Sequence, residues 1–247
     1  MEDIRKNLAD IRLRIAAAAE RSGRRAEDVT LVCVTKTRTV EEIKEVIEAG
    51  ECQLGENQVQ EFLGKYDRIQ DIAAGLDKKP NIMWNLVGHL QRNKVKYLAG
   101  KVSLIHSVDS FRLAEEIDKR FGRAGEKAAV LIQVNTALEP QKSGVAVSEC
   151  EALVDEISDR LHNVRIKGLM AVTPEAPDPE DLRGYFRSAK QVYDMLAKKQ
   201  GGAFAGFECL SMGMTHDFEV AIEEGATIVR VGTAIFGPRK YETEDKV

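Results

Sequence analysis

One lysine stands at the end of a short β-branched run, where a strand can deliver a side chain to a site. The run is VTLVCVTK, and two-residue alternation places Val32, Val34 and Lys36 on one face. A lysine in a partly apolar pocket loses its proton more readily and can attack an aldehyde as the free amine. The alternative is that Lys36 only extends from the strand end into solvent. Lys142, in a predicted loop, and Lys167, at the middle of a predicted strand, are weaker candidates.

Two loops near the end of the chain carry small and hydroxyl residues. They read LSMGMT (residues 210–215) and RVGTAIFG (residues 230–237). Small residues let backbone N–H groups approach an anion, and the hydroxyls of Ser211 and Thr233 add donors. The alternative is that Gly213 and Gly232 serve only tight turns. Barrels often bind phosphate with the loops after strands seven and eight, so phosphate binding is the favoured interpretation.

Arg230 lies inside the apolar run TIVRVG. Arginine rarely occupies a core strand unless acceptors inside receive its hydrogen bonds. One alternative is a structural salt bridge to an acid such as Glu56. The other is donation to the ring nitrogen of a heteroaromatic cofactor such as pyridoxal 5′-phosphate (PLP), which would keep that nitrogen unprotonated and weaken the ring as an electron sink.

Eight strand-like runs alternate with helix-like segments after one extra amphipathic helix at residues 2–22. The runs are residues 29–35, 52–54, 83–87, 102–106, 129–134, 164–171, 207–210 and 227–231. Helical patterns cover residues 40–49, 58–69, 91–98, 111–121, 148–161, 179–199 and 218–224. Strands alternating with helices indicate a parallel sheet, and eight such units favour closure. We therefore expect an α/β protein, a single (β/α)8 TIM-type barrel domain over residues 1–247.

Composition excludes several other classes. The 247 residues carry a net charge of −4 with 31% charged residues, which is an ordinary surface without a basic field for nucleic acid. No apolar run approaches the roughly 20 residues that span a bilayer. The N-terminus lacks the apolar stretch of a signal peptide, so we expect a cytoplasmic protein. The four cysteines are expected to be reduced, and the four scattered histidines predict no metal site.

Several segments together resemble the YggS/PROSC family of pyridoxal phosphate homeostasis proteins. They run from the first strand to the end of the predicted barrel: VTKTRTVEEI, LGENQVQEF, WNLVGHLQRNK, VLIQVNTALEPQKSGV, KGLMAVTP and LSMGMTHDFEVAIEEGATIVRVGTAIFGPR. The last segment is the most specific because it joins both loops to the arginine strand. The family is similar in fold to the barrel domain of alanine racemases, without their additional C-terminal β-domain.

The resemblance implies a PLP site with assigned residues. PLP would be held covalently on Lys36 as a Schiff base, with the pyridine nitrogen near Arg230 and Asn57 lining the pocket. The phosphate would be held by Ser211, Met212, Gly232 and Thr233. Two residues depart from the expected pattern: Asn85 stands where we expect histidine, and Thr215 where serine is frequent.

The resemblance also implies a function in intracellular PLP and amino-acid homeostasis, without catalytic turnover. A racemase acting through the barrel alone is the alternative, but it needs a second base opposite Lys36. No tyrosine is an obvious candidate, because Tyr66, Tyr97, Tyr185, Tyr193 and Tyr241 fall in helical or tail contexts. A third hypothesis is a phosphate-binding barrel enzyme without PLP. As partners we expect PLP-dependent apo-enzymes that receive the cofactor, and neither nucleic acid nor membrane. Without the racemase second domain, we expect a monomer.

Overall fold

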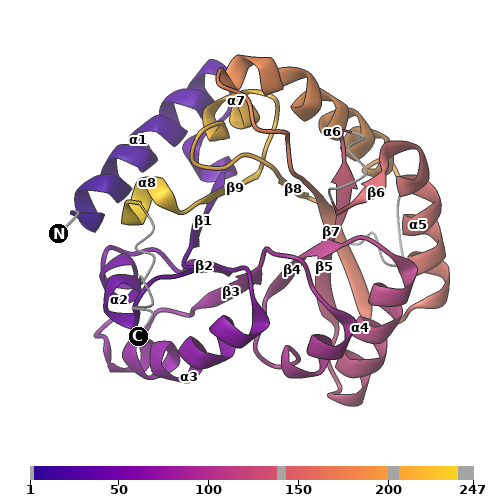
Figure 1. Cartoon of the computed structure of the whole chain (residues 1–247), viewed down its shortest axis with the longest axis horizontal. Coiled ribbons are helices and arrows are strands. Elements are labelled where there is room, and N and C mark those ends of the chain that lie inside the picture. Colours follow the sequence, from indigo (N-terminus) through magenta and orange to yellow (C-terminus); the bar gives the residue numbers. More distant parts are fainter. Residues whose placement is uncertain (1–2, 138–142, 200–205, 239–247) are drawn as a thin grey trace, which may run out of the picture.

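A computed structural model describes residues 3–137, 143–199 and 206–238. Eight parallel strands close into a barrel, with helices around it (Figure 1). The barrel strands are β1 (Thr30–Val34), β2 (Gln53–Glu56), β3 (Met83–Leu86), β4 (Leu104–Val108), β5 (Ala128–Asn135), β7 (Val164–Ala171), β8 (Cys209–Ser211) and β9 (Ile228–Val231). Pairing of β9 with β1 and of β4 with β5 completes the ring. The predicted eight-stranded barrel is confirmed.

The helices follow the strands in chain order. They are α1 (Ile4–Arg21), α2 (Val40–Glu48), α3 (Val59–Gly75), α4 (Phe111–Arg123), α5 (Val147–Arg160), α6 (Arg183–Leu196), α7 (Phe218–Glu223) and α8 (Thr233–Phe236), with 3-10 turns η1 (Ala26–Asp28), η2 (Arg92–Tyr97) and η3 (Pro179–Leu182). The local sequence explains where α2 begins. At α2 the Thr39 hydroxyl accepts from the Glu42 N–H, and the Glu42 carboxylate accepts from the Thr39 N–H.

Two predicted elements differ from the structure, and one element was not predicted. Residues 91–98 form the 3-10 turn η2 rather than an α-helix, and the predicted helix over 179–199 begins with η3 at Pro179 before α6 continues it. A short strand, β6 (Val145–Ala146), was not predicted and pairs with the end of β5. Its two residues carry no alternation pattern, which explains why sequence reasoning missed it.

The barrel interior has an apolar layer beneath a polar one. Inward-facing Val32, Leu104, Leu131, Met170 and Ile228 form an apolar cluster separate from the larger core between strands and helices. Towards the C-terminal ends of the strands, the same inward faces carry polar residues: Asn85, His106, Ser211 and Arg230. The interior therefore changes from hydrophobic packing to hydrogen bonding along the barrel axis.

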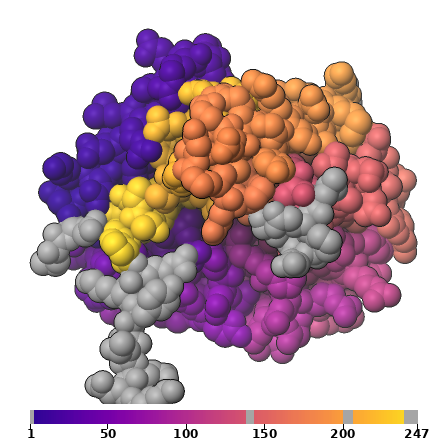
Figure 2. All heavy atoms as spheres, turned by 45° about the horizontal axis from the view of Figure 1, so that its top comes forward, coloured from indigo at the N-terminus to yellow at the C-terminus, as the bar shows by residue number. Residues whose placement is uncertain are grey.

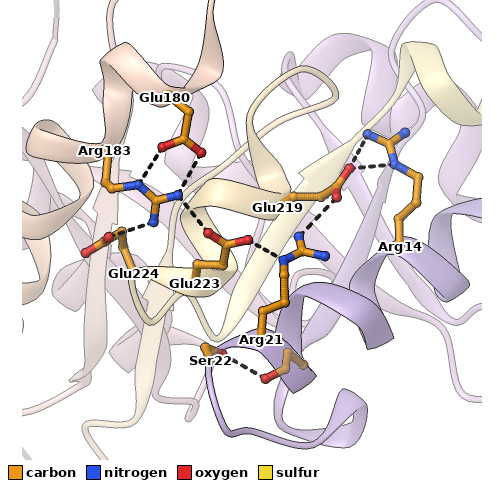
Figure 3. A network of polar contacts seen from close by, with 9 residues as sticks. Arg14, Arg21, Ser22, Glu180, Arg183, Glu219, Glu223 and Glu224 are labelled. Carbon is orange, nitrogen blue, oxygen red and sulfur yellow. Dashed lines mark hydrogen bonds and ion pairs between the residues drawn. The ribbon is translucent and has the colours of Figure 1, made fainter.

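Helix α1 is tied to the rest of the barrel by a surface network of ion pairs (Figure 3). Arg14 and Arg21 of α1 contact Glu219 of α7, and Arg21 also contacts Glu223. Arg183 extends the network to η3 and α6.

Among the described residues, no helix combines the length and apolar composition that a bilayer crossing requires.

Candidate functional site

A cavity of about 530 Å³ opens at the C-terminal ends of the barrel strands. Ligand pockets in proteins commonly fall between roughly 300 and 1,000 Å³, so this space suits a small cofactor. It is lined by Val34, Lys36, Arg38, Asn57, Val87, Val172, Thr173, Pro174, Glu175, Ala176, Leu182, Met214, Thr215, His216, Asp217, Arg230, Gly232 and Thr233. The loops after β1, β2, β3, β7, β8 and β9 thus build one site.

Five of the seven predicted site residues line this cavity together: Lys36, Asn57, Arg230, Gly232 and Thr233. The strand alternation explains the position of Lys36. Val32 belongs to the inner apolar layer, Val34 lines the cavity, and Lys36 follows on the same face, half-buried. The amine is therefore carried at the barrel mouth and not on the outer, helix-covered face.

The turn that carries Lys36 is held by helix α3. Thr37 has φ 62°, a conformation that costs a non-glycine residue roughly 1 kcal/mol or more. Its N–H donates to Glu61 Oε1 (2.5 Å), and buried Lys65 donates to the Thr35 carbonyl (2.8 Å) and to Glu56 and Glu61 (both 2.7 Å). These contacts stabilise the strained turn and so fix the direction in which Lys36 leaves the strand.

Arg230 lies on the inward face of β9, at the floor of the cavity. Its guanidinium donates to Ser211 Oγ (2.6 Å) and to the Ala171 carbonyl (3.1 Å). Burial lowers the pKa of Arg230 to about 10, opposed by the negative charge of Asp217, so the side chain stays protonated at neutral pH. The alternative partner Glu56 is excluded because its carboxylate bonds to Lys65 and Thr35.

The structure does not bring Ser211 and Met212 to the cavity. The Ser211 side chain is 0% exposed, and its hydroxyl contacts Arg230 and His106 Nδ1 (3.0 Å). Met212 packs in the outer core, and its N–H donates to the Ile228 carbonyl (3.1 Å). Their predicted role as direct phosphate ligands conflicts with this geometry, because the groups that would contact the phosphate are already used inside the barrel.

Glycine stands at positions 213 and 232 for two different structural reasons. Gly213 has φ 91°, and a Cβ there would lie 2.6 Å from the Ala221 Cβ, so a turn packed against α7 requires glycine. Gly232 has an ordinary φ, but a Cβ would lie 3.2 Å from the Val34 carbonyl oxygen at the cavity wall. The tight-turn interpretation thus accounts for Gly213, while Gly232 allows a close approach beside Lys36.

Several residues that line the cavity received no binding role from the sequence, although the loop after β8 was itself predicted to bind. The loop after β7 contributes Glu175, and the loop after β8 contributes Thr215 and His216. The two loops are joined, since Thr173 Oγ1 donates to Asp217 Oδ2 (3.0 Å). Figure 2 shows the orange residues after β7 on the same face as the yellow C-terminal residues. Thr215 lies within the predicted segment LSMGMT, so giving a role to every hydroxyl of that segment would have included it.

Arg38 is a second missed residue, and it acts on the neighbouring loop. Its buried guanidinium donates to the carbonyls of Phe236 (3.0 Å), Gly237 and Pro238 (3.3 Å). It therefore ties the turn after β1 to the end of α8. With Lys36 and Arg230 it makes three basic side chains at the cavity, against the two acids Glu175 and Asp217. That balance favours an anionic ligand.

Some predictions lie beyond the described residues or concern absences. Lys142 and Tyr241 are outside them. None of the tyrosines in the described ranges lines the cavity, and Lys167 does not line it either. Over the same ranges, no group of three or more histidine, cysteine or acidic side chains is placed to hold a metal ion.

The alanine racemase N-terminal domain family matches residues 7–240. A pyridoxal phosphate homeostasis protein of Aquifex aeolicus is 44% identical over 236 residues, covering 96% of this chain and 98% of its own. The chain belongs to the pyridoxal phosphate homeostasis protein family. A second member of that family, from Escherichia coli, is 37% identical over 98% of this chain and 99% of its own length.

Solved structures agree with this family. PipY of Synechococcus elongatus, solved with PLP bound, is 31% identical and has a TM-score of 0.79, covering 95% of this chain and all of PipY. Alanine racemase of Clostridium difficile is 15% identical with a TM-score of 0.68, covering 98% of this chain and 58% of the racemase. The second likeness shows the shared barrel fold alone.

Proposed function

We propose that this protein binds PLP in the barrel-mouth cavity and serves intracellular PLP homeostasis, with the cofactor held covalently by Lys36. The observation that carries the proposal is that one cavity collects an amine, a buried guanidinium and a hydroxyl- and glycine-lined edge. Membership of the pyridoxal phosphate homeostasis family and the PLP-bound relative PipY support it. When bound, PLP supplies an aldehyde for the amine and a heteroaromatic ring that can accept electrons.

Each residue has a distinct role in this proposal. Lys36 Nζ forms the covalent link, and Asn57 lines the wall beside it. Arg230 keeps its proton and donates to the ring nitrogen, which therefore stays unprotonated. Gly232 and the hydroxyls of Thr233 and Thr215 hold the phosphate, with Thr215 taking the place first predicted for Ser211.

The decisive experiment is borohydride trapping of the protein with PLP, followed by peptide mapping. We expect one labelled lysine, Lys36, and complete loss of the label and of the bound-cofactor absorbance in Lys36→Ala. Lys167→Ala, which changes a lysine outside the cavity, is the matched control and keeps the label. A wild-type protein labelled on any other lysine, or on none, contradicts the proposal.

We further propose that the protein acts as a PLP carrier or regulator without turnover. Its partners would be PLP-dependent apo-enzymes, and the chain would act as a single-domain cytoplasmic monomer. The racemase alternative needs a second base, and the titratable side chains that line the cavity include His216 and Glu175. Exchange of the α-proton of alanine, serine and glutamate in D₂O separates the two. We expect no exchange above that of free PLP, whereas saturable exchange that depends on Lys36 would favour the racemase.

A further inference from the structure

A chain of buried hydrogen bonds crosses the barrel interior behind Arg230. It runs from the guanidinium to Ser211 Oγ (2.6 Å), from Ser211 to His106 Nδ1 (3.0 Å), and from His106 Nε2 to Asn85 Oδ1 (3.1 Å). All four side chains are at most 5% exposed. Bulk water therefore has little access to these groups, and each buried donor needs an acceptor.

Asn85 determines the direction of this chain. Its amide nitrogen faces the Gln53 side-chain oxygen (3.0 Å) and the backbone carbonyl oxygens of Leu54 (3.2 Å) and Met83 (3.1 Å). The two backbone carbonyls can only accept. The Asn85 amide must therefore point its oxygen at His106. It follows that His106 Nε2 carries the proton and Nδ1 does not.

The remaining bonds follow from that tautomer. Because Nδ1 of His106 accepts, the Ser211 hydroxyl donates its proton to it, and a lone pair of Ser211 Oγ accepts from Arg230. Burial, and next the positive charge of Arg230, hold the pKa of His106 well below its usual range, so the ring is neutral. The Ser211 hydroxyl thus donates its one proton to His106 and has none left to donate to a phosphate.

We propose that His106 and Asn85 are positioning residues for the cofactor: they orient the Ser211 hydroxyl, which together with the Ala171 carbonyl fixes the pose in which Arg230 meets the cofactor ring. This inference rests on the proposed PLP function. It gives Asn85, which stands where a histidine was expected, a defined role, because an amide at this position can donate to two carbonyls and accept from His106 at the same time.

The test compares how tightly the full chain, after removal of bound cofactor, binds three ligands: PLP, pyridoxal, and the PLP analogue whose ring nitrogen is replaced by a C–H group. We expect His106→Leu to weaken PLP and pyridoxal by the same factor, about tenfold, equivalent to ~1.4 kcal/mol. The ring-carbon analogue should bind both proteins equally, because it offers Arg230 no acceptor. His106→Asn, whose amide oxygen can replace Nδ1, should recover part of the loss.

Ser107→Ala, on the opposite face of the same strand, is the control and should change none of the three affinities. Loss of the ring-carbon analogue to the same extent as PLP would overturn the inference, since the site would then have collapsed generally. Undiminished PLP binding in His106→Leu would also overturn it. A wild-type protein that binds none of the ligands would instead refute the proposed function.

A measurement without ligand addresses the hydrogen bonds themselves. ¹⁵N NMR of the histidine rings distinguishes a protonated from an unprotonated nitrogen. We expect His106 to be protonated at Nε2 alone, and in Asn85→Leu we expect that preference to be lost. A wild-type His106 protonated at Nδ1 would contradict the direction of the chain, whatever the ligand data show.

Discussion

Two polar networks in this molecule use arginine in opposite ways. Inside the barrel, Arg230 meets a serine hydroxyl and a backbone carbonyl, and its network continues through neutral His106. On the surface, Arg183 meets three carboxylates, Glu180, Glu223 and Glu224, at 2.7–2.8 Å (Figure 3). The first network is buried, and Arg230 is its one charged side chain. The second lies at the surface and consists of charged side chains.

The two networks differ in how many alternative partners each polar group can find. In the interior, the links from Arg230 to Ser211, from Ser211 to His106 and from His106 to Asn85 each join one pair of groups, so removing one member leaves the next without that partner and the order of these bonds is forced. On the surface, Glu223 bridges Arg183 and Arg21, and water can replace either partner. The interior network therefore fixes the orientation of a side chain that meets the ligand. The surface network joins α1 to α7, and each of its ion pairs contributes little to stability.

Replacing the buried arginine should give the largest effect. Arg230→Met leaves Ser211 Oγ and the Ala171 carbonyl without a donor, and we expect roughly 2 kcal/mol or more of lost stability. PLP and pyridoxal should both bind more weakly, because both carry the ring. Urea unfolding and absorbance titration measure the two effects. Arg187→Met, at an exposed arginine bound to Glu224, is the matched control; equal losses in the two variants would remove the distinction between the networks.

Replacing the cavity hydroxyls should separate phosphate binding from ring binding. Thr215→Val and Thr233→Val keep the side-chain shape but remove a donor to the phosphate. A hydrogen bond to a charged group contributes roughly 1.5–3 kcal/mol, so PLP affinity should fall about tenfold or more while pyridoxal affinity stays unchanged. Ser211→Ala should instead weaken both ligands alike. A PLP-specific loss in Ser211→Ala would return the phosphate role to that residue.

Sequence periodicity was sufficient for the fold and for the residues on the cavity-facing strands. The alternation of Val32, Val34 and Lys36 predicted the inward face of β1, and the apolar run TIVRVG predicted the buried strand β9 that carries Arg230. These predictions succeed because a strand has a period of two, and burial of one face makes the register unambiguous.

The failures concern contacts between strands far apart in the chain. Ser211 was predicted at the phosphate because it follows a strand near glycine, yet its partners come from β4 and β9. His106 gave no signal in the sequence because no second histidine stands at metal-ligand spacing. Its partner Asn85 is 21 residues away on the neighbouring strand β3, while its partner Ser211 lies across the barrel on β8, and only closure of the barrel brings Ser211 and His106 together. One sequence gives no information on such cross-barrel pairs.

The buried histidine should make stability depend on pH. The pKa of His106 in the folded protein lies well below that of the unfolded chain, about 6.5, so the unfolded state binds a proton that the folded state does not. Stability that is present above pH ~6.5 is therefore lost as the pH falls. Between pH 7 and 5.5 we expect wild type to lose about 1 kcal/mol more than His106→Asn in urea unfolding. Parallel pH profiles for the two proteins would mean that His106 takes up a proton in the fold.

Removing the surface arginine should give the smallest effect, and one that salt abolishes. Arg183→Met removes one partner from each of three carboxylates, but Glu223 keeps Arg21 and Glu224 keeps Arg187. Because surface ion pairs each contribute about 0–1 kcal/mol, we expect a loss of stability within about 1 kcal/mol. In 1 M NaCl the screening length falls to about 3 Å, and the difference from wild type should shrink towards zero. PLP and pyridoxal affinities should be unchanged, since no contact of Arg183 reaches the cavity. A loss that persists at high salt would show that Arg183 contributes by packing its side chain between α6 and α7, and the surface network would then resemble the interior one.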